Sequence, residues 1–207
     1  MTKIDLRKEW KHLYSPSTRE AVMLTVPPMA FLMIDGQGDP NTSPAYQEAV
    51  EALYALSYGL KFAIKRAEGV DYAVMPLEGL WWAEDPVSFA AGDKDAWLWT
   101  AMIMQPEYVT GERVLGVAAE VRRKKGLAAC DLARFEVFDE GLAAQVLYVG
   151  PYAEEAPTIA RLHAYIAEQG YTLQGKHHEI YLGDPRRTAP DRLRTIIRQP
   201  AAPRSAG

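Results

Sequence analysis

The sequence predicts an α+β fold built from two copies of a β-α-β-β module. The first observation is a pair of apolar runs that end in glycine-containing turns, FLMIDGQGDP at 31–40 and VLYVGPYAEE at 146–155. The second is that a helical pattern follows each run, and that two further strand-like runs follow each helical pattern. The third is a pair of nearly identical closing fragments, MIMQP at 102–106 and IIRQP at 196–200. A duplication explains this shared order better than chance similarity between two unrelated α+β halves.

Capping residues delimit the helix that is expected in each module. In the first module, Ser43 can act as the N-cap and Pro44 can take the first helical position. In the second module, Pro157 opens the helix and Gly170 ends it. Apolar residues recur at helical spacing in both, namely Ala49, Leu53, Leu56 and Leu60 in one helix and Ile159, Leu162 and Ile166 in the other.

The duplication predicts one compact domain made of two modules. Two such modules can pair their sheets about a pseudo-twofold axis, with each sheet covered on its outer side by its helix. A central ligand cavity is then expected at the interface between them. The expected boundaries are an N-terminal segment at 1–21, the first module at 22–108, a connecting helix at 109–133, the second module at 134–200 and a flexible tail at 201–207.

The connecting helix itself is expected over 111–125. Thr110 can cap it, Glu112 lies in its first turn and Gly126 ends it. The basic run RRKK at 122–125 falls in the last turn, where cationic side chains complement the helix dipole. We therefore interpret this run as a solvated helix end rather than as a phosphate site.

Composition and charge argue against several classes of function. The net charge of the 207 residues is −4, so no basic surface for direct nucleic-acid binding is expected. No segment approaches the ~20 apolar residues that span a bilayer, so no membrane partner is expected. Cys130 is the single cysteine, which excludes an internal disulfide and fits a cytoplasmic location. The N-terminus has no apolar run behind its charges, as a signal peptide would have.

Tryptophan residues are concentrated in one stretch of the chain. Trp81, Trp82, Trp97 and Trp99 are four of the five tryptophans. Because Trp81 and Trp82 are consecutive, they point to opposite faces of a strand, and at most one of them lines a given cavity. Trp97 and Trp99 share a face, either as a core pair or as a stacking wall for a planar ligand. Such rings favour aromatic cations through cation–π attraction.

The run HHEIYLGDPRR at 177–187 places a carboxylate inside a predicted strand. A period of two puts His177, Glu179 and Tyr181 on one face. A charge on an apolar face is costly without a partner. Glu179 therefore either lies on a wet surface and pairs with a nearby arginine, or lines a cavity that suits a negative charge.

Four motifs carry a family resemblance, namely PLEGLWW at 76–82, MIMQPE at 102–107, GPYAEEAPTI at 150–159 and EIYLGDPRR at 179–187. Together they resemble the GyrI-like small-molecule-binding family, above all its stand-alone branch, over roughly residues 20–200. The resemblance implies paired β-α-β-β units, as in bacterial effector-binding domains, around a cavity for small, aromatic and often cationic molecules. Many members are fused to a helix-turn-helix domain, for which the residues before the first module are too few, so direct transcriptional control is not expected. Some stand-alone members are hydrolases that open the cyclopropane ring of DNA-alkylating natural products.

The resemblance also implies roles for residues within these motifs. Glu179 matches the cavity glutamate of the family, and a bound cation or a reacting electrophile would supply its partner. Trp81 or Trp82 and Tyr152 match aromatic residues of the cavity, while Tyr148 stands where the family also accepts histidine.

Three other side chains near these motifs have two interpretations each. Tyr152 and Tyr181 either donate a hydrogen bond inside the cavity or are half-buried with the hydroxyl at the surface. Glu78 is either a second cavity carboxylate or a turn residue.

Two functions can use the same cavity. In a binding protein, Glu179 supplies charge complementarity and the rings supply stacking. In a hydrolase, Glu179 is the general base, with a pKa expected to be raised by burial, and Tyr152 or Tyr181 stabilises the oxygen that gains charge. Neither function requires a cofactor, and His177 and His178 lack a third ligand for a metal site. A third alternative is a binder of a protein partner such as a topoisomerase.

Overall fold

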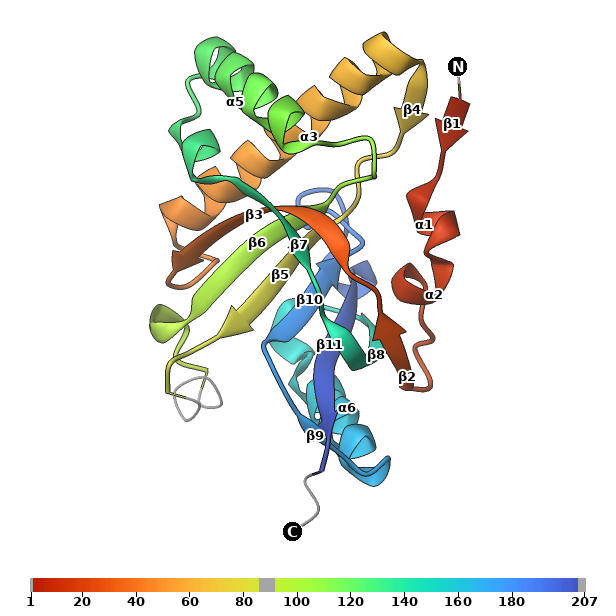
Figure 1. The fold of residues 1–207 in the computed structure, drawn as a ribbon. Helices are drawn as coiled ribbons and strands as arrows, with labels where there is room; N and C mark the ends of the chain where they lie inside the picture. The colour runs from red at the N-terminus through yellow and green to blue at the C-terminus, as the bar shows by residue number, and fades with distance from the viewer. Residues whose placement is uncertain (1, 86–91, 205–207) are drawn as a thin grey trace. The chain divides into compact units, whose positions relative to one another are not determined.

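The chain forms two compact units in a computed structural model, which describes residues 2–85 and 92–204 (Figure 1). Unit 1 comprises Met1–Glu9 and Met29–Phe138, and unit 2 comprises Trp10–Pro28 and Asp139–Gly207. Each unit combines an antiparallel sheet with helices, so the predicted α+β class is confirmed.

Unit 1 contains an antiparallel sheet in the strand order β5-β6-β3-β7 (Figure 1). A short parallel pair, formed by β1 and β4, lies at the start of the chain and after the long helix. The bounds are Thr2–Ile4 for β1, Met29–Gln37 for β3, Val70–Tyr72 for β4, Leu77–Trp82 for β5, Leu98–Met104 for β6 and Arg134–Phe138 for β7.

Two long helices of unit 1 begin at the predicted caps, and α5 also ends at the predicted Gly126. The hydroxyl of Ser43 accepts a hydrogen bond from the backbone of Tyr46 at the start of α3 (Pro44–Glu68), and Gly69 ends this helix with a φ of 68°. Thr110 caps α5 (Gly111–Lys125), which confirms the helix expected at 111–125. Within residues 2–85 and 92–204, no helix has both the length and the apolar character for crossing a bilayer. The short helices in the described part of the unit are α1 (Leu6–Glu9), η1 (Lys94–Ala96) and η2 (Ala128–Leu132).

Unit 2 contains an antiparallel sheet in the order β2-β8-β11-β10, and β9 pairs with the far end of β11. Helix α6 packs on one face of this sheet. Leu162 and Ile166 of α6 are fully buried there against Val146 and Ile197. The bounds are Val22–Val26 for β2, Gly141–Val149 for β8, Tyr171–Leu173 for β9, His177–Tyr181 for β10, Arg194–Pro203 for β11 and Ala156–Glu168 for α6, with short helices at Lys11–Tyr14 (α2), Tyr152–Glu154 (η3) and Pro190–Arg192 (η4).

The predicted repeat is visible in both element order and strand pairing. The segment β3-α3-β5-β6 corresponds to β8-α6-β10-β11, and the sheets run β5-β6-β3 and β10-β11-β8. The last strand of each repeat is therefore the middle strand of its own three. This correspondence makes each residue of one sheet comparable with a residue of the other.

The strand that precedes each repeat pairs with the other repeat. β2 comes just before β3 in the chain but pairs with β8, and β7 comes just before β8 but pairs with β3. The compact units consequently differ from the modules expected at 22–108 and 134–200. Pro27 and Pro28 link β2 to β3, and the fixed negative φ of proline disfavours the two-residue hairpin turn that direct pairing would need.

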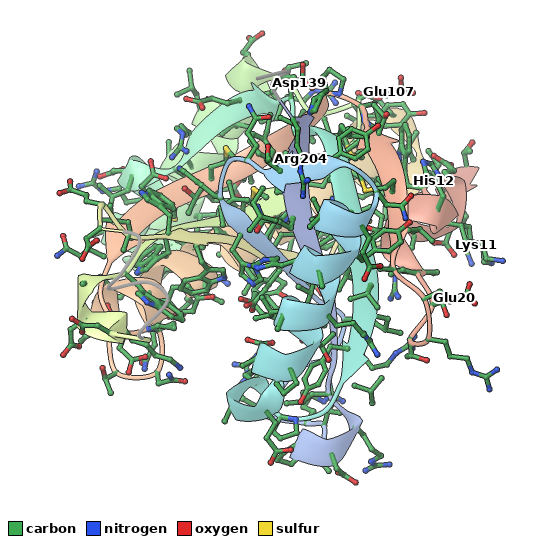
Figure 2. The ribbon with its side chains drawn as sticks, turned by 90° about the horizontal axis from the view of Figure 1, so that it is seen from below. Lys11, His12, Glu20, Glu107, Asp139 and Arg204 are labelled. Carbon is green, nitrogen blue, oxygen red and sulfur yellow. The ribbon has the colours of Figure 1, made fainter. Side chains whose placement is uncertain are left out.

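A charged network is buried on the face of the unit 2 sheet opposite α6. The side chain of Arg198 is 2% exposed and donates hydrogen bonds to Glu140 (3.0 Å), to Gln145 and to the backbone carbonyl of Leu13. His178 Nδ1 lies 2.8 Å from the other oxygen of Glu140. The network fixes α2 against three strands. Leu13 is buried there, whereas Lys11 and Glu20 extend outward from the N-terminal part of the unit (Figure 2).

The pKa of Glu140 reflects this network. Burial alone would raise the pKa, but the charge and hydrogen bond of His178, followed by those of Arg198, outweigh burial and lower it to about 2. A carboxyl whose pKa is lowered in the folded state stabilises the fold above its ordinary pKa. That contribution is lost as the pH falls from 4.5 towards 2.

We expect Glu140→Gln to lower the free energy of unfolding near neutral pH by about 3–5 kcal/mol, because the charge of Arg198 stays buried without its partner. The difference from the parent should shrink at acidic pH, where the parent loses the same charge. Denaturant unfolding at both pH values measures this. The exposed Glu51→Gln is the control, and an equal loss at both pH values would contradict the assignment.

Candidate functional site

Glu179 lies on the sheet face that α6 covers. It is the direct partner of Ile197 in the β10–β11 register, and opposite residues of an antiparallel pair share a face. Ile197 belongs to the core under α6. Glu179 is only 8% exposed, and the nearby Arg186 forms an ion pair with Asp184. The carboxylate is therefore buried rather than on a solvent-exposed surface.

Two neighbours on the same face bind the two oxygens of Glu179. The hydroxyl of Tyr181 donates to Oε2 at 2.8 Å, and Nε2 of His177 lies 3.0 Å from Oε1. Glu155, at the start of α6, also interacts with the carboxyl group of Glu179 and contributes to lowering its pKa. Each carboxylate oxygen has two lone pairs, so Glu179 can still accept a hydrogen bond from a ligand or water.

These neighbours lower the pKa of Glu179. Burial acts in the opposite direction and is the largest single influence, but the hydrogen bond and the charge of His177, the hydrogen bond from Tyr181 and the interaction with Glu155 together exceed it. The raised pKa expected from the sequence is therefore wrong. Glu179 is a buried carboxylate that stays ionised at neutral pH, because the donors around it favour the charged form.

The predicted tyrosines lie around this carboxylate. The rings of Tyr152 and Tyr181 meet edge to face with centroids 5.7 Å apart. The hydroxyl of Tyr148 donates to the carbonyl of Pro151 at 2.9 Å and so holds the turn before Tyr152. Burial, and then the charges of Glu154 and Glu155, raise the pKa of Tyr148. The hydroxyl of Tyr148 thus supports the turn that positions Tyr152.

Sequence reasoning did not assign Glu155 or His163 to this site. His163 of α6 is half-buried, and its pKa is lowered by burial and then by the charge of His177. The helical period contained the signal for His163, because it shares a face with Ile166. Glu155 follows Tyr152 in the motif GPYAEE, but nothing in that motif indicates an interaction with Glu179.

The predicted tryptophans lie in unit 1, on two faces of its sheet. Trp81 and Trp99 are register partners on the face that α3 covers, where they are 3% and 1% exposed. Both rings contact Tyr46, with centroids 5.6 and 5.0 Å away, and the ring of Trp97 lies 5.8 Å from that of Trp81. Trp82 points to the opposite face, as the strand period predicts.

Glu78 shares the face of Trp82, since the two residues are four apart in one strand. It lies inside β5 rather than in a turn, and it is fully buried. Lys94 places its ammonium 5.4 Å from the ring centroid of Trp97, which is a cation–π contact. Unit 1 thus supplies a buried aromatic cluster on one face and a buried carboxylate on the other.

We expect Gly36→Ala to lower the free energy of unfolding by about 1–3 kcal/mol through overpacking. A Cβ at this position would lie 2.1 Å from the ring of Trp99. Gly116→Ala in α5 is the control, because no atom lies within 4 Å of its added Cβ. That control should be stabilising by about 0.5–1 kcal/mol. Thermal and denaturant unfolding measure both variants. An unchanged free energy of unfolding in Gly36→Ala would contradict the close packing of Trp99 against Gly36.

We expect Tyr181→Phe to raise the pKa of Glu179, because it removes a hydrogen bond to the charged form. A carboxyl-carbon NMR titration of labelled glutamates measures the change. Tyr165→Phe, on the same helix as His163 but without a bond to Glu179, is the matched control. An unchanged titration in Tyr181→Phe would mean that the hydroxyl does not stabilise the carboxylate.

Solved structures from Listeria innocua are similar to this chain over nearly its whole length. An uncharacterized conserved protein is 39% identical, with a TM-score of 0.89, and the match covers 96% of this chain and 100% of the other. A hydrolase is 38% identical with a TM-score of 0.87, covering 97% and 100%. A second hydrolase structure is 36% identical with a TM-score of 0.84, covering 96% and 100%.

More distant comparisons agree on the fold. The C-terminal domain of EcmrR is 14% identical with a TM-score of 0.53, covering 89% of this chain and 98% of that domain, which shows the fold alone. No curated protein is significantly similar in sequence. The GyrI-like small molecule binding domain matches residues 20–201. The chain therefore belongs to the GyrI-like small molecule binding domain family.

Proposed function

We propose that this protein is a hydrolase that acts on a small aromatic molecule. The observation that carries the proposal is the buried, ionised carboxylate of Glu179, held by His177 and Tyr181 on the α6 face. It is supported by 36–38% identity to two structures of hydrolases over almost the entire chain. The family membership supplies the substrate class, a small molecule.

The chemistry available to Glu179 is proton removal from water. A carboxylate that is ionised at neutral pH can accept a proton without first losing one, and its remaining lone pairs can bind water. The lowered pKa makes Glu179 a weaker base than the sequence suggests, so the substrate has to be a reactive electrophile. A strained ring meets this condition.

The proposed substrate is a cyclopropane conjugated to a carbonyl group, as in DNA-alkylating natural products. The oxygen of water attacks a ring methylene, one carbon–carbon bond of the ring breaks, and its electron pair moves through the conjugated system to the carbonyl oxygen. Glu179 takes one proton from the attacking water. The oxygen that gained charge is then protonated, so the product is the substrate plus one molecule of water.

The two tyrosines take different parts in this proposal. Tyr181 directs its proton to Glu179, so we assign it to holding the carboxylate. Tyr152, whose ring contacts Tyr181, is assigned as the donor to the oxygen that gains charge. Tyr148, whose hydroxyl holds the turn before Tyr152, is assigned to supporting that donor. The ligand-binding roles expected for Glu78 and for Trp81, Trp82, Trp97 and Trp99 of unit 1 stay predictions, and at most one of Trp81 and Trp82 can line a given cavity.

A second candidate function is binding without turnover. The lowered pKa of Glu179 favours it, because an ionised carboxylate in an enclosed site attracts an aromatic cation. Such a protein would sequester its ligand, and the same residues would be needed. The two functions differ only in whether product accumulates beyond one equivalent.

We expect the parent protein to convert a cyclopropane-bearing alkylator to the ring-opened hydrate over many turnovers, with Glu179→Gln slower by about 10²–10⁴-fold. Product is followed by mass spectrometry, and ligand affinity by quenching of tryptophan fluorescence. Glu154→Gln is the matched control, because it changes an exposed neighbour. One equivalent of bound ligand without product would support the binding function instead.

A further inference from the structure

Thr195 is a buried residue on the α6-facing side of the unit 2 sheet, near the start of β11. It pairs with Tyr148 of β8 on one side and with Tyr181 of β10 on the other. Its exposed fraction is 0%, and among residues 2–85 and 92–204 its hydroxyl has no hydrogen-bond partner. Because Thr195 precedes Ile197 by two positions in β11, its side chain lies on the same face as Glu179.

The equivalent position in the other repeat shows that the fold does not require this hydroxyl. The closing fragments align Thr195 with Ala101, which is also fully buried and pairs with Ile34 and Gly79. The row across three strands is therefore Ile-Ala-Gly in unit 1 and Tyr-Thr-Tyr in unit 2. The next row places Leu77 where unit 2 has Glu179. At these positions unit 2 has polar side chains where unit 1 has apolar residues or glycine, and the polar side chains are neighbours of one another.

A buried hydroxyl without a partner destabilises a protein, and a bound water molecule is a usual partner for such a group. Thr195 lies opposite Tyr181, whose hydroxyl is 2.8 Å from Glu179 Oε2. Thr195 and Glu179 are diagonal neighbours, with Cβ atoms ~7–8 Å apart or somewhat less. One water molecule, with hydrogen bonds of ~2.8 Å on each side, spans two such side chains.

We propose that Thr195 binds the attacking water of the hydrolase beside Glu179. The inference rests on the proposed function and assigns the second group that holds the nucleophile. The water donates one hydrogen to Glu179 and the other to the hydroxyl oxygen of Thr195, which leaves its own lone pair directed at the substrate. Glu179 removes its proton as the new carbon–oxygen bond forms, and Thr195 is unchanged at the end of the cycle.

Thr195→Val tests this role, because valine keeps the shape of the side chain and replaces only the hydroxyl with a methyl group. With a cyclopropane-bearing alkylator as substrate, we expect kcat to fall at least ~10-fold and KM to change less than ~3-fold, since water rather than substrate is misplaced. The Tm should stay equal or rise, because an unsatisfied buried group is lost. Thr195→Ser should keep kcat within ~3-fold of the parent.

Thr100→Val is the matched control from the other sheet. Thr100 is as buried as Thr195, but its hydroxyl donates to Asp35 at 2.6 Å. Its loss should lower Tm and leave kcat unchanged.

Parental kcat in Thr195→Val would overturn the role of Thr195 while leaving the hydrolase intact. A fall in Tm together with kcat would also overturn it, because the hydroxyl would then be structural. A parent protein that binds the alkylator without turnover would overturn the proposed function and the water site together.

Discussion

The enclosed charge of Glu179 is the constraint on which the rest of the site depends. A carboxylate beneath a helix is tolerable only when donors replace the water that it has lost. His177 and Tyr181 provide those donors from the same strand, so the strand period itself builds the site. The turn before α6 brings Tyr152 and Glu155 to the same place. The carboxylate is thereby held in one orientation, with its charged form favoured, before any ligand arrives.

The two repeats have diverged in chemistry while keeping one arrangement of strands. In unit 1 the face under the helix is filled by tryptophan rings and small apolar residues, as in an ordinary core. In unit 2 the corresponding face carries tyrosines, a threonine and a glutamate. The opposite face of unit 2 carries the ion network of Glu140 and Arg198. A duplicated module can leave stability to one copy while the other accepts buried polar groups, which are costly for folding.

Local signals in the sequence predicted the elements, whereas pairings between distant residues did not follow from them. Ser43 and Gly126 delimit helices through bonds within a few residues, so both boundaries could be predicted. The pairing of β2 with β8 has no local signal. The sequence also placed His177 and Tyr181 beside Glu179, but the direction of its pKa shift was wrong, because the opposing effects of burial and hydrogen bonding depend on their magnitudes.

The pairing of β2 with β8 and of β7 with β3 has a consequence for the synthesis of this protein. During synthesis the β2 segment leaves the ribosome long before its partner β8 exists, and β3 likewise lacks β7 until the linking helix has been translated. Unpaired strand edges are prone to intermolecular association. A chain cut within α5 would give one fragment with β2 and β3 and another with β7 and β8. Each fragment would lack a strand that its own sheet needs, and only mixing the two would complete both sheets.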